Sequence, residues 1–233
     1  MNTDPHGLGV ADDDHEPELN ADFSRLVTAD TEAMPWQGSP AGGVQRQRLE
    51  LIGGEMPRLT SVVRFAPGSA FPEHTHDGGE EFLVLDGVFS DAEGDHPTGS
   101  YVRNPPGTRH APSSRNGCML FVKLRQFAPG DSRRVVVPPE ARTWHELTNG
   151  LDRCELHRFG TERVDLLRWE DASHWSPDGG EGGVELFILD GEVTCDGRGL
   201  PRHGWLRLPP GHAPTLGGAA GTLAWIKTGH LTS

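Results

Sequence analysis

The chain has 233 residues, which is long enough for two domains of about 100 residues, each able to bury a core. Its 34 acidic and 21 basic residues give a net charge of −13, which disfavours binding to nucleic acid or to anionic membrane surfaces. The sequence contains neither a signal peptide nor an apolar run near the roughly 18 residues that span a bilayer, so we expect a cytoplasmic protein without a membrane partner.

The first 22 residues differ in composition from the rest of the chain. They carry seven acidic residues and almost no large apolar side chain. Such a segment cannot bury enough surface to offset the entropy lost on ordering. We therefore predict a disordered acidic tail over residues 1–22.

Glycine and proline are frequent throughout the remainder of the chain. The 31 glycines and 19 prolines separate short runs of Val, Leu and Phe, and no long stretch follows the helical period of 3.6 residues. This pattern is typical of all-β barrels with many tight turns. Residues 31–36 and 139–144 are the best candidates for helix, although both could equally be loops.

A group of histidines and one glutamate follows the first strands. In an extended segment alternate side chains share a face, so His74 and His76 point to the same side while Thr75 points away. The glycines at 78 and 79 allow a turn, after which Glu80 opens an apolar strand over residues 82–85. The turn at residues 104–107 then delivers His110 at the start of another strand. Three imidazoles and a carboxylate on neighbouring strands predict a site for one divalent transition metal, with iron, zinc, manganese and nickel all compatible.

The spacing of these residues resembles that of the cupins. The sequence contains Gly68-x5-His74-x-His76-x3-Glu80-x6-Gly87 followed by Gly99-x5-Pro105-x-Gly107-x2-His110, which matches both parts of the cupin motif. It departs from the motif at Ser114, where an asparagine is usual. The stretches 64–68, 78–85 and 103–107 resemble ChrR-type cupins in particular. The resemblance is strong over residues 23–127 and implies a metal-binding jelly-roll barrel, also called a double-stranded β-helix.

One part of the ChrR pattern is missing. The best-known ChrR proteins carry an N-terminal zinc module with a His-x3-Cys-x2-Cys anchor, which binds a sigma factor. Here no cysteine precedes Cys118, so we do not expect this chain to bind a sigma factor by that route. The three cysteines, Cys118, Cys154 and Cys195, form no CxxC pair and are expected to be free thiols. Cys118 is predicted to be a small buried residue rather than a metal ligand.

The second half of the sequence is a copy of the first. Residues 24–36 align with 132–144 at an offset of 108, and from residue 64 onward an offset of 104 pairs residues 85–87 with 189–191 and 105–107 with 209–211. This tandem duplication predicts a second barrel over residues 128–233.

The copy has lost the candidate ligands. At the positions of His74, His76, Glu80 and His110 it carries, in order, Asp178, Gly180, Val184 and Pro214. We therefore predict a metal-free second barrel and one metal per chain. Glu185 and His212 could in principle substitute, but their spacing is wrong for a metal site, and we interpret them as polar groups on the barrel rim.

Three residues near the predicted site require separate assignments. Glu81 points away from Glu80 across the strand and is expected to form an outward salt bridge or to lie on the rim. Tyr101 and Arg103 could face the cavity, where Arg103 could bind an anionic substrate. Because Arg207 occupies the equivalent place in the copy without ligands, a structural role for Arg103 is favoured.

Two functions are compatible with these features. The first is a mononuclear non-haem metal enzyme of the dioxygenase type, acting on a small molecule in a barrel whose wall of Phe82, Val84 and Phe121 excludes water. The second is a non-catalytic, metal- or redox-responsive sensor linked to oxidative-stress signalling. Fold alone does not separate them. Exposed barrel edges are compatible with a homodimer.

Overall fold

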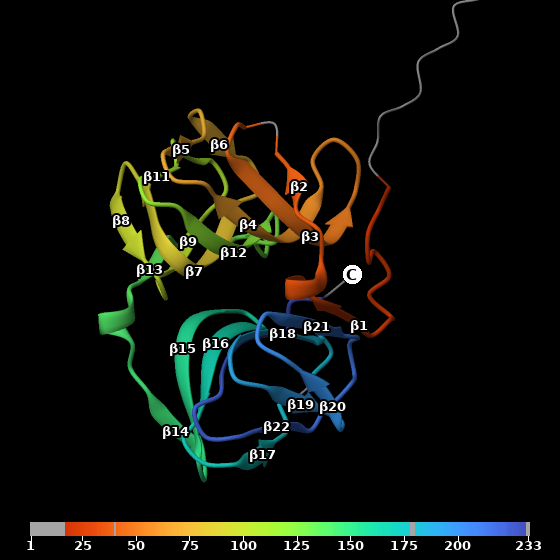
Figure 1. Ribbon diagram of the computed structural model, residues 1–233. Helices are drawn as coiled ribbons and strands as arrows, with labels where there is room; N and C mark the ends of the chain where they lie inside the picture. The colour runs from red at the N-terminus through yellow and green to blue at the C-terminus, as the bar shows by residue number, and fades with distance from the viewer. Residues whose placement is uncertain (1–16, 40, 178–179, 232–233) are drawn as a thin grey trace, which may run out of the picture.

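The computed structural model describes residues 17–39, 41–177 and 180–231, and within them it consists almost entirely of β-strands. Figure 1 shows two barrels, one above the other. The two segments that were candidates for helix each form a single 3₁₀ turn, η1 (Thr31–Ala33) and η2 (Pro139–Ala141). Neither of these described turns is long and apolar enough to cross a membrane. The predicted all-β class with two tandem barrels is confirmed.

The first barrel is built from the strands between η1 and η2. Their bounds are β2 (Gln37–Gly38), β3 (Val44–Ile52), β4 (Arg58–Phe65), β5 (Ser69–Ala70), β6 (His74–His76), β7 (Glu80–Asp91), β8 (Gly94–Pro97), β9 (Tyr101–Asn104), β10 (Thr108–His110), β11 (Ser113–Ser114), β12 (Cys118–Leu124) and β13 (Val135–Val137). The main sheet has the order β13-β9-β7-β12-β4-β3-β2, and β6 pairs separately with β10.

The second barrel repeats most of this plan. Its strands are β14 (His145–Thr148), β15 (Leu151–Phe159), β16 (Glu162–Trp169), β17 (Ser173–Trp175), β18 (Val184–Asp190), β19 (Val193–Cys195), β20 (Arg198–Leu200), β21 (Gly204–Leu208), β22 (Leu216–Gly218) and β23 (Leu223–Thr228). With β1 (Val27–Asp30) they form a seven-stranded sheet, β1-β21-β18-β23-β16-β15-β14, and a four-stranded sheet, β17-β22-β19-β20. The described residues of this half contain no counterpart of the β6–β10 pair.

The two halves exchange their first strands. β1 pairs antiparallel with β21, Val27 lying opposite Arg207, and so belongs to the second barrel. In return β13 pairs with β9 of the first barrel, Val135 lying opposite Arg103. Each of the domains that we propose, 23–127 and 128–233, therefore supplies one edge strand to the other barrel.

The N-terminal segment is also attached to this architecture. Residues 17–22, which we assigned to the acidic tail, lie along the first barrel: Leu19 forms a β-bridge with Leu51, and the Asn20 side chain donates to the backbone oxygen of Leu49. The tail assignment is corrected for these residues, because their backbone groups find partners on β3. Residues 1–16 lie outside the described part of the chain.

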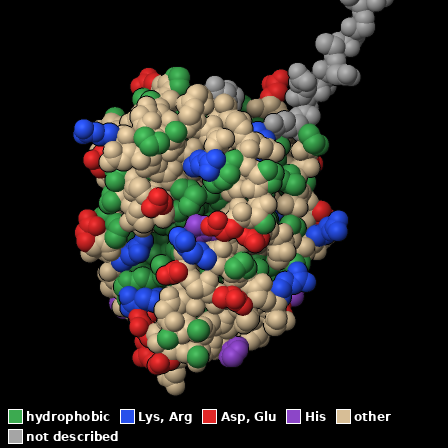
Figure 2. Space-filling view, in the orientation of Figure 1, with side chains coloured by type: hydrophobic (Ala, Val, Ile, Leu, Met, Phe, Trp, Pro, Cys, Tyr) green, Lys and Arg blue, Asp and Glu red, His purple; other side chains and the backbone are tan. Residues whose placement is uncertain are grey.

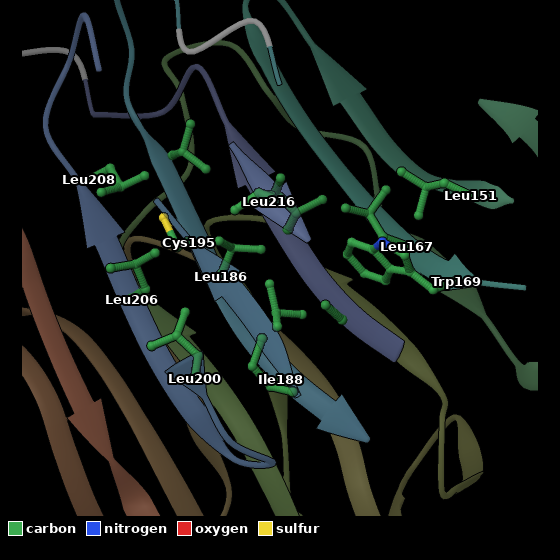
Figure 3. Packing of buried hydrophobic residues seen from close by; sticks show 14 residues of the cluster. Leu151, Leu167, Trp169, Leu186, Ile188, Cys195, Leu200, Leu206, Leu208 and Leu216 are labelled. Carbon is green, nitrogen blue, oxygen red and sulfur yellow. The ribbon is translucent and has the colours of Figure 1, made fainter. Parts of the chain in front are cut away.

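Apolar side chains form three clusters, one in each barrel and one between them. The cluster of the second barrel is built from β15 to β23 and contains Trp169, Leu186 and Ile188 (Figure 3). The cluster of the first barrel contains Phe82 and Val84, which we expected in the cavity wall but which do not line the cavity. The third joins the barrels, and in it Phe121 stacks on Phe187 with ring centroids 4.5 Å apart. Phe121 therefore does not line the cavity of the first barrel. Our prediction was wrong because Phe121 points to the opposite side of β12 from Leu120 and Val122.

Charged side chains are buried between the barrels as well. Lys123 of the first barrel donates to both oxygens of Glu185 at 2.6 and 2.7 Å, and Lys227 of the second barrel donates to Glu81 at 2.6 Å. These four residues occupy equivalent positions in the two copies, since 81 and 185, like 123 and 227, differ by the offset of 104. The reciprocal pairs satisfy charges that would be costly to bury alone.

The surface is mixed in charge. On the face shown in Figure 2, acidic and basic side chains lie interspersed. This face therefore offers no extended basic surface of the kind that binds a phosphate backbone.

Candidate metal centre

The short β6–β10 pair brings the three histidines together. His74 lies opposite His110 and Thr75 opposite Arg109 in the antiparallel register. His76 and His110 are buried, His74 is partly buried, and Thr75 is exposed. The alternation predicted for residues 74–76 is confirmed.

The three rings form one compact cluster. Their centroids are 4.7 to 5.1 Å apart, and their candidate ligand nitrogens all lie within 4.8 Å of one another. The Nε2 atoms of His76 and His110 are 2.9 Å apart. At a metal–nitrogen distance of ~2.1 Å, two adjacent ligands of one ion are themselves separated by roughly 3 Å. The spacing of the Nε2 atoms of His76 and His110 therefore fits a common ion.

Glu80 lies beside the histidines at the start of β7. Its Oε2 atom is 3.4 Å from His76 Nε2 and 3.5 Å from His110 Nε2. The same oxygen accepts a hydrogen bond of 3.3 Å from the Asn104 side chain, whose Oδ1 in turn accepts from Arg134 Nε at 3.3 Å. The carboxylate is thus held toward the imidazoles, in a position compatible with the predicted fourth ligand.

Hydrogen bonds on the far side of two rings set their tautomers. Nδ1 of His74 is 2.9 Å from the backbone oxygen of Pro72, which can only accept, so this nitrogen is the donor. Nδ1 of His110 is 3.2 Å from Oδ2 of Asp91. In both rings the Nε2 lone pair is thereby left for a metal, and a carboxylate behind a ligating imidazole raises its basicity.

The electrostatics of the cluster differ between its two buried rings. Burial lowers the pKa of His76, opposed by the charge of Glu80, and so favours the neutral ring that can ligate. Burial likewise acts to lower the pKa of His110, but the hydrogen bond with Asp91 and the charge of Glu80 outweigh it and raise that pKa. Burial acts against ionisation of Asp91, and the hydrogen bonds from His110 and His96 overcome it, so the pKa of Asp91 is strongly lowered. Asp91 is therefore a carboxylate at neutral pH.

A cavity opens next to the histidine cluster. Its volume is about 250 Å³. Most of its wall is apolar, with Arg46 and Arg125 also lining it; the apolar lining includes Leu59, Val63, Phe65, Phe71, Phe89, Leu120 and Val122. A small, largely apolar molecule could therefore reach the centre of the cluster.

The second barrel has no equivalent centre among its described residues. The candidate metal-binding group found in the described chain is that of His74, His76 and His110. Glu185, expected on the rim, is instead fully buried between the barrels, where it accepts from Lys123, from Trp205 Nε1 and from His230. His212 is partly exposed and pairs with Asp196 at 2.8 Å. Asp178, the residue at the position of His74, lies outside the described residues.

Arg103 and Tyr101 also lie away from the cavity, contrary to the expectation that they could face it. Arg103 is fully buried between the barrels and pairs at 2.8 Å with Glu81, Asp131 and Glu162. Tyr101 donates to Glu81 at 2.9 Å. The structural role favoured for Arg103 is confirmed. Glu81 forms the expected salt bridge, but it is buried because the second barrel covers that face.

Two residues of the site were not found from the sequence. Asp91 ends β7, eleven residues after Glu80, and contacts His110 from the part of β7 that pairs with β8. Asn104 was noted only as part of a turn, although it lies opposite Glu80 in the β7–β9 register. To identify Asp91 or Asn104 as part of the site, one would have needed to know how β7 pairs with β8 and β9. Cys118 is a buried free thiol of the first-barrel core, as expected.

Comparison with solved structures finds a similar fold in proteins described as dioxygenases and in a nickel-bound pirin. The chain is similar to a putative dioxygenase from Nostoc punctiforme PCC 73102 (TM-score 0.72, 15% identity, covering 90% of this chain and 85% of that chain). It is also similar to a salicylate 1,2-dioxygenase from Pseudoaminobacter salicylatoxidans (TM-score 0.61, 10% identity, 93% and 83%). A third match is the bacterial pirin of Escherichia coli in complex with nickel(II) (TM-score 0.60, 13% identity, 88% and 99%). At these identities the likeness establishes the fold alone.

Comparison by sequence identifies the family. A search of curated protein sequences finds no match to this chain. The family model described as the ChrR cupin-like domain matches twice, at residues 24–128 and 132–232, which together span most of the chain. The two matches coincide with the tandem copies seen in the sequence and with the two barrels. The chain therefore belongs to the ChrR cupin-like domain family and carries that domain in duplicate.

Proposed function

We propose that the first barrel binds one divalent transition metal through His74, His76, Glu80 and His110 and acts as a mononuclear metal-dependent enzyme of the dioxygenase type on a small molecule. The observation that carries this proposal is the apolar cavity of about 250 Å³ that opens on the histidine cluster. A site that only held a structural metal would not need such a cavity.

The side chains around the cluster have distinct roles in this proposal. His74, His76, Glu80 and His110 would hold a divalent ion, which would supply a site where a substrate oxygen and dioxygen could be brought together. Asp91 holds His110 in its ligating tautomer, and Asn104 holds Glu80. The phenylalanines of the cavity wall exclude water from the reacting groups.

The composition of the cavity limits the substrate class. An apolar wall with three phenylalanines suits a planar aromatic or enolic body, and Arg46 and Arg125 suit an anionic oxygen at its edge. We therefore propose an aromatic or enolic compound that offers two oxygen donors to the metal. β-Diketones and phenolic acids of this kind form the first panel to test.

The first experiment measures metal content and oxygen consumption. Purified full-length protein should contain about one metal per chain by elemental analysis, and His76→Ala should lose it, whereas His212→Ala in the second barrel should not. The iron-loaded protein should consume dioxygen with at least one compound of the panel. Two metals per chain, or unchanged metal in His76→Ala, would contradict the single-site assignment. Tightly held zinc without turnover would instead favour the sensor function.

A further inference from the structure

The second barrel contains a cavity of its own. Its volume is about 320 Å³, and it is lined from β15, β16, β17 and β23. It lies where the metal cavity lies in the first barrel: Asp165 and Trp175 of its lining correspond, at the offset of 104, to Ser61 and Phe71 of the first cavity. The second barrel therefore has a cavity at the same place, although its sequence lacks the three histidines of the first.

The wall of this cavity includes a buried carboxyl group that lacks a partner. Asp165 is 5% exposed, and its Oδ1 atom has no hydrogen-bond partner among the described residues. Burial raises the pKa of Asp165 to about 7, although the nearby charge of Arg153 acts against this rise. A buried polar group without a partner costs on the order of 1–3 kcal/mol, and such groups in folded proteins often have a function.

A guanidinium group shares this face of the barrel. Arg153 lies two residues from Glu155, which is directly opposite Asp165 in the β15–β16 register, so the side chains of all three point to the same side. Glu155 pairs instead with Arg158 at 3.2 Å and with Arg163 at 3.9 Å. Arg153 forms no ion pair with any side chain in the described part of the chain. Its donors are therefore available to the cavity.

The remaining wall is partly apolar. Leu147, Trp175 and Ile226 contribute side chains to it. An indole at the side of a cavity offers a flat surface for a ring or a short hydrocarbon. The cavity thus combines an anion-binding group, an acceptor and an apolar surface within one small volume.

We propose that the second barrel binds, without a metal, a small carboxylic acid that also carries a hydroxyl or amino group. The carboxylate of the ligand pairs with Arg153, its hydroxyl or amino group donates to Asp165, and its apolar part lies against Trp175. A purely cationic ligand would leave Arg153 without a partner, and a simple carboxylate would leave Asp165 without a donor.

Mandelate is a suitable probe, because it combines a phenyl ring, a hydroxyl and a carboxylate. Phenylglycine replaces the hydroxyl with an amino group, and phenylacetate lacks the donor. Hydroxy acids also chelate metal ions, so binding is measured by calorimetry in full-length His76→Ala protein, which separates this site from the proposed metal centre. We expect mandelate, phenylglycine or both to bind one per chain and at least tenfold more tightly than phenylacetate.

Substitutions in the cavity then locate the binding. In the same protein, Asp165→Leu should remove the preference over phenylacetate, and Arg153→Met should weaken binding at least tenfold. In the absence of ligand, Asp165→Leu should melt at a higher temperature than its parent, because it removes an unpartnered buried polar group; this also shows that the variant is folded. The proposal is overturned if no probe binds, or if binding is the same in Asp165→Leu and Arg153→Met as in their parent.

Discussion

The buried ion pair between Lys123 and Glu185 should be a main determinant of stability. Lys123 Nζ donates to Glu185 Oε1 and Oε2 at 2.6 and 2.7 Å and to Thr60 Oγ1 at 2.9 Å. Lys123 is 1% exposed and Glu185 is fully buried. Lys123→Met keeps the length and apolar stem of the side chain and removes only its charge and its donors.

The cost of this substitution follows from what remains around Glu185. The carboxylate would keep two donors, Trp205 Nε1 and His230 Nε2, both at 2.8 Å. The carboxylate would lose the charge of Lys123. Burial acts to raise the pKa of Glu185, and the charge of Lys123 contributes most to holding that pKa well below its ordinary value. Removing one partner of a buried pair typically costs about 3–5 kcal/mol, a large part of the 5–15 kcal/mol by which domains are stable.

Urea unfolding of metal-free protein provides the measurement, with Lys123→Met/Glu185→Gln as the companion variant. The neutral amide no longer needs a cation and can still accept from Trp205, so the double variant should recover more than half of the loss. A loss below about 1 kcal/mol in Lys123→Met would refute the reasoning. Strict additivity of the single substitutions Lys123→Met and Glu185→Gln would refute it as well.

Three further outcomes are expected. Asp91→Asn should weaken metal binding by about 10- to 100-fold in a chelator competition, because the amide supports His110 less well, whereas Asp95→Asn on the same hairpin should leave it unchanged. Because the pKa of Asp165 is about 7 when folded and 3.8 ordinarily, the folded state binds its proton more tightly, so the free energy of unfolding should fall by about 2–4 kcal/mol between about pH 4 and about pH 7. Asp165→Asn should lack this decrease when unfolding is followed at both pH values. Deleting residues 1–30 should raise hydrogen exchange in β21, which loses its neighbour β1, and not in β9; equal protection in both strands would contradict the observed pairing.

The histidine cluster was predictable because its signal is local. His74 and His76 are two residues apart, and strand periodicity alone places them on one side. His110 required only a turn of known type before it. The duplication, visible in the sequence, also predicted correctly that Arg103 is structural, because Arg207 stands at the same position in the copy whose sequence lacks the candidate ligands.

The contacts between the barrels could not be predicted in the same way. Alternation along β12 shows that Phe121 and Lys123 share a side, but not whether that side faces the cavity or another barrel. The burial of Glu81 depends on Lys227, 146 residues later in the chain. Nothing local distinguishes such a glutamate from one on an open surface.

The exchange of edge strands bears on how the chain is made. β1 emerges from the ribosome early, but its pairing partner Gly204–Leu208 is synthesised more than 170 residues later. Until then the second barrel does not exist, and Val27–Asp30 has no sheet to join. Contacts of such sequence separation slow folding, so the final seating of this strand should follow completion of both barrels. A nascent chain stalled before residue 204 would hold a nearly finished first barrel with its leading segment still unpaired.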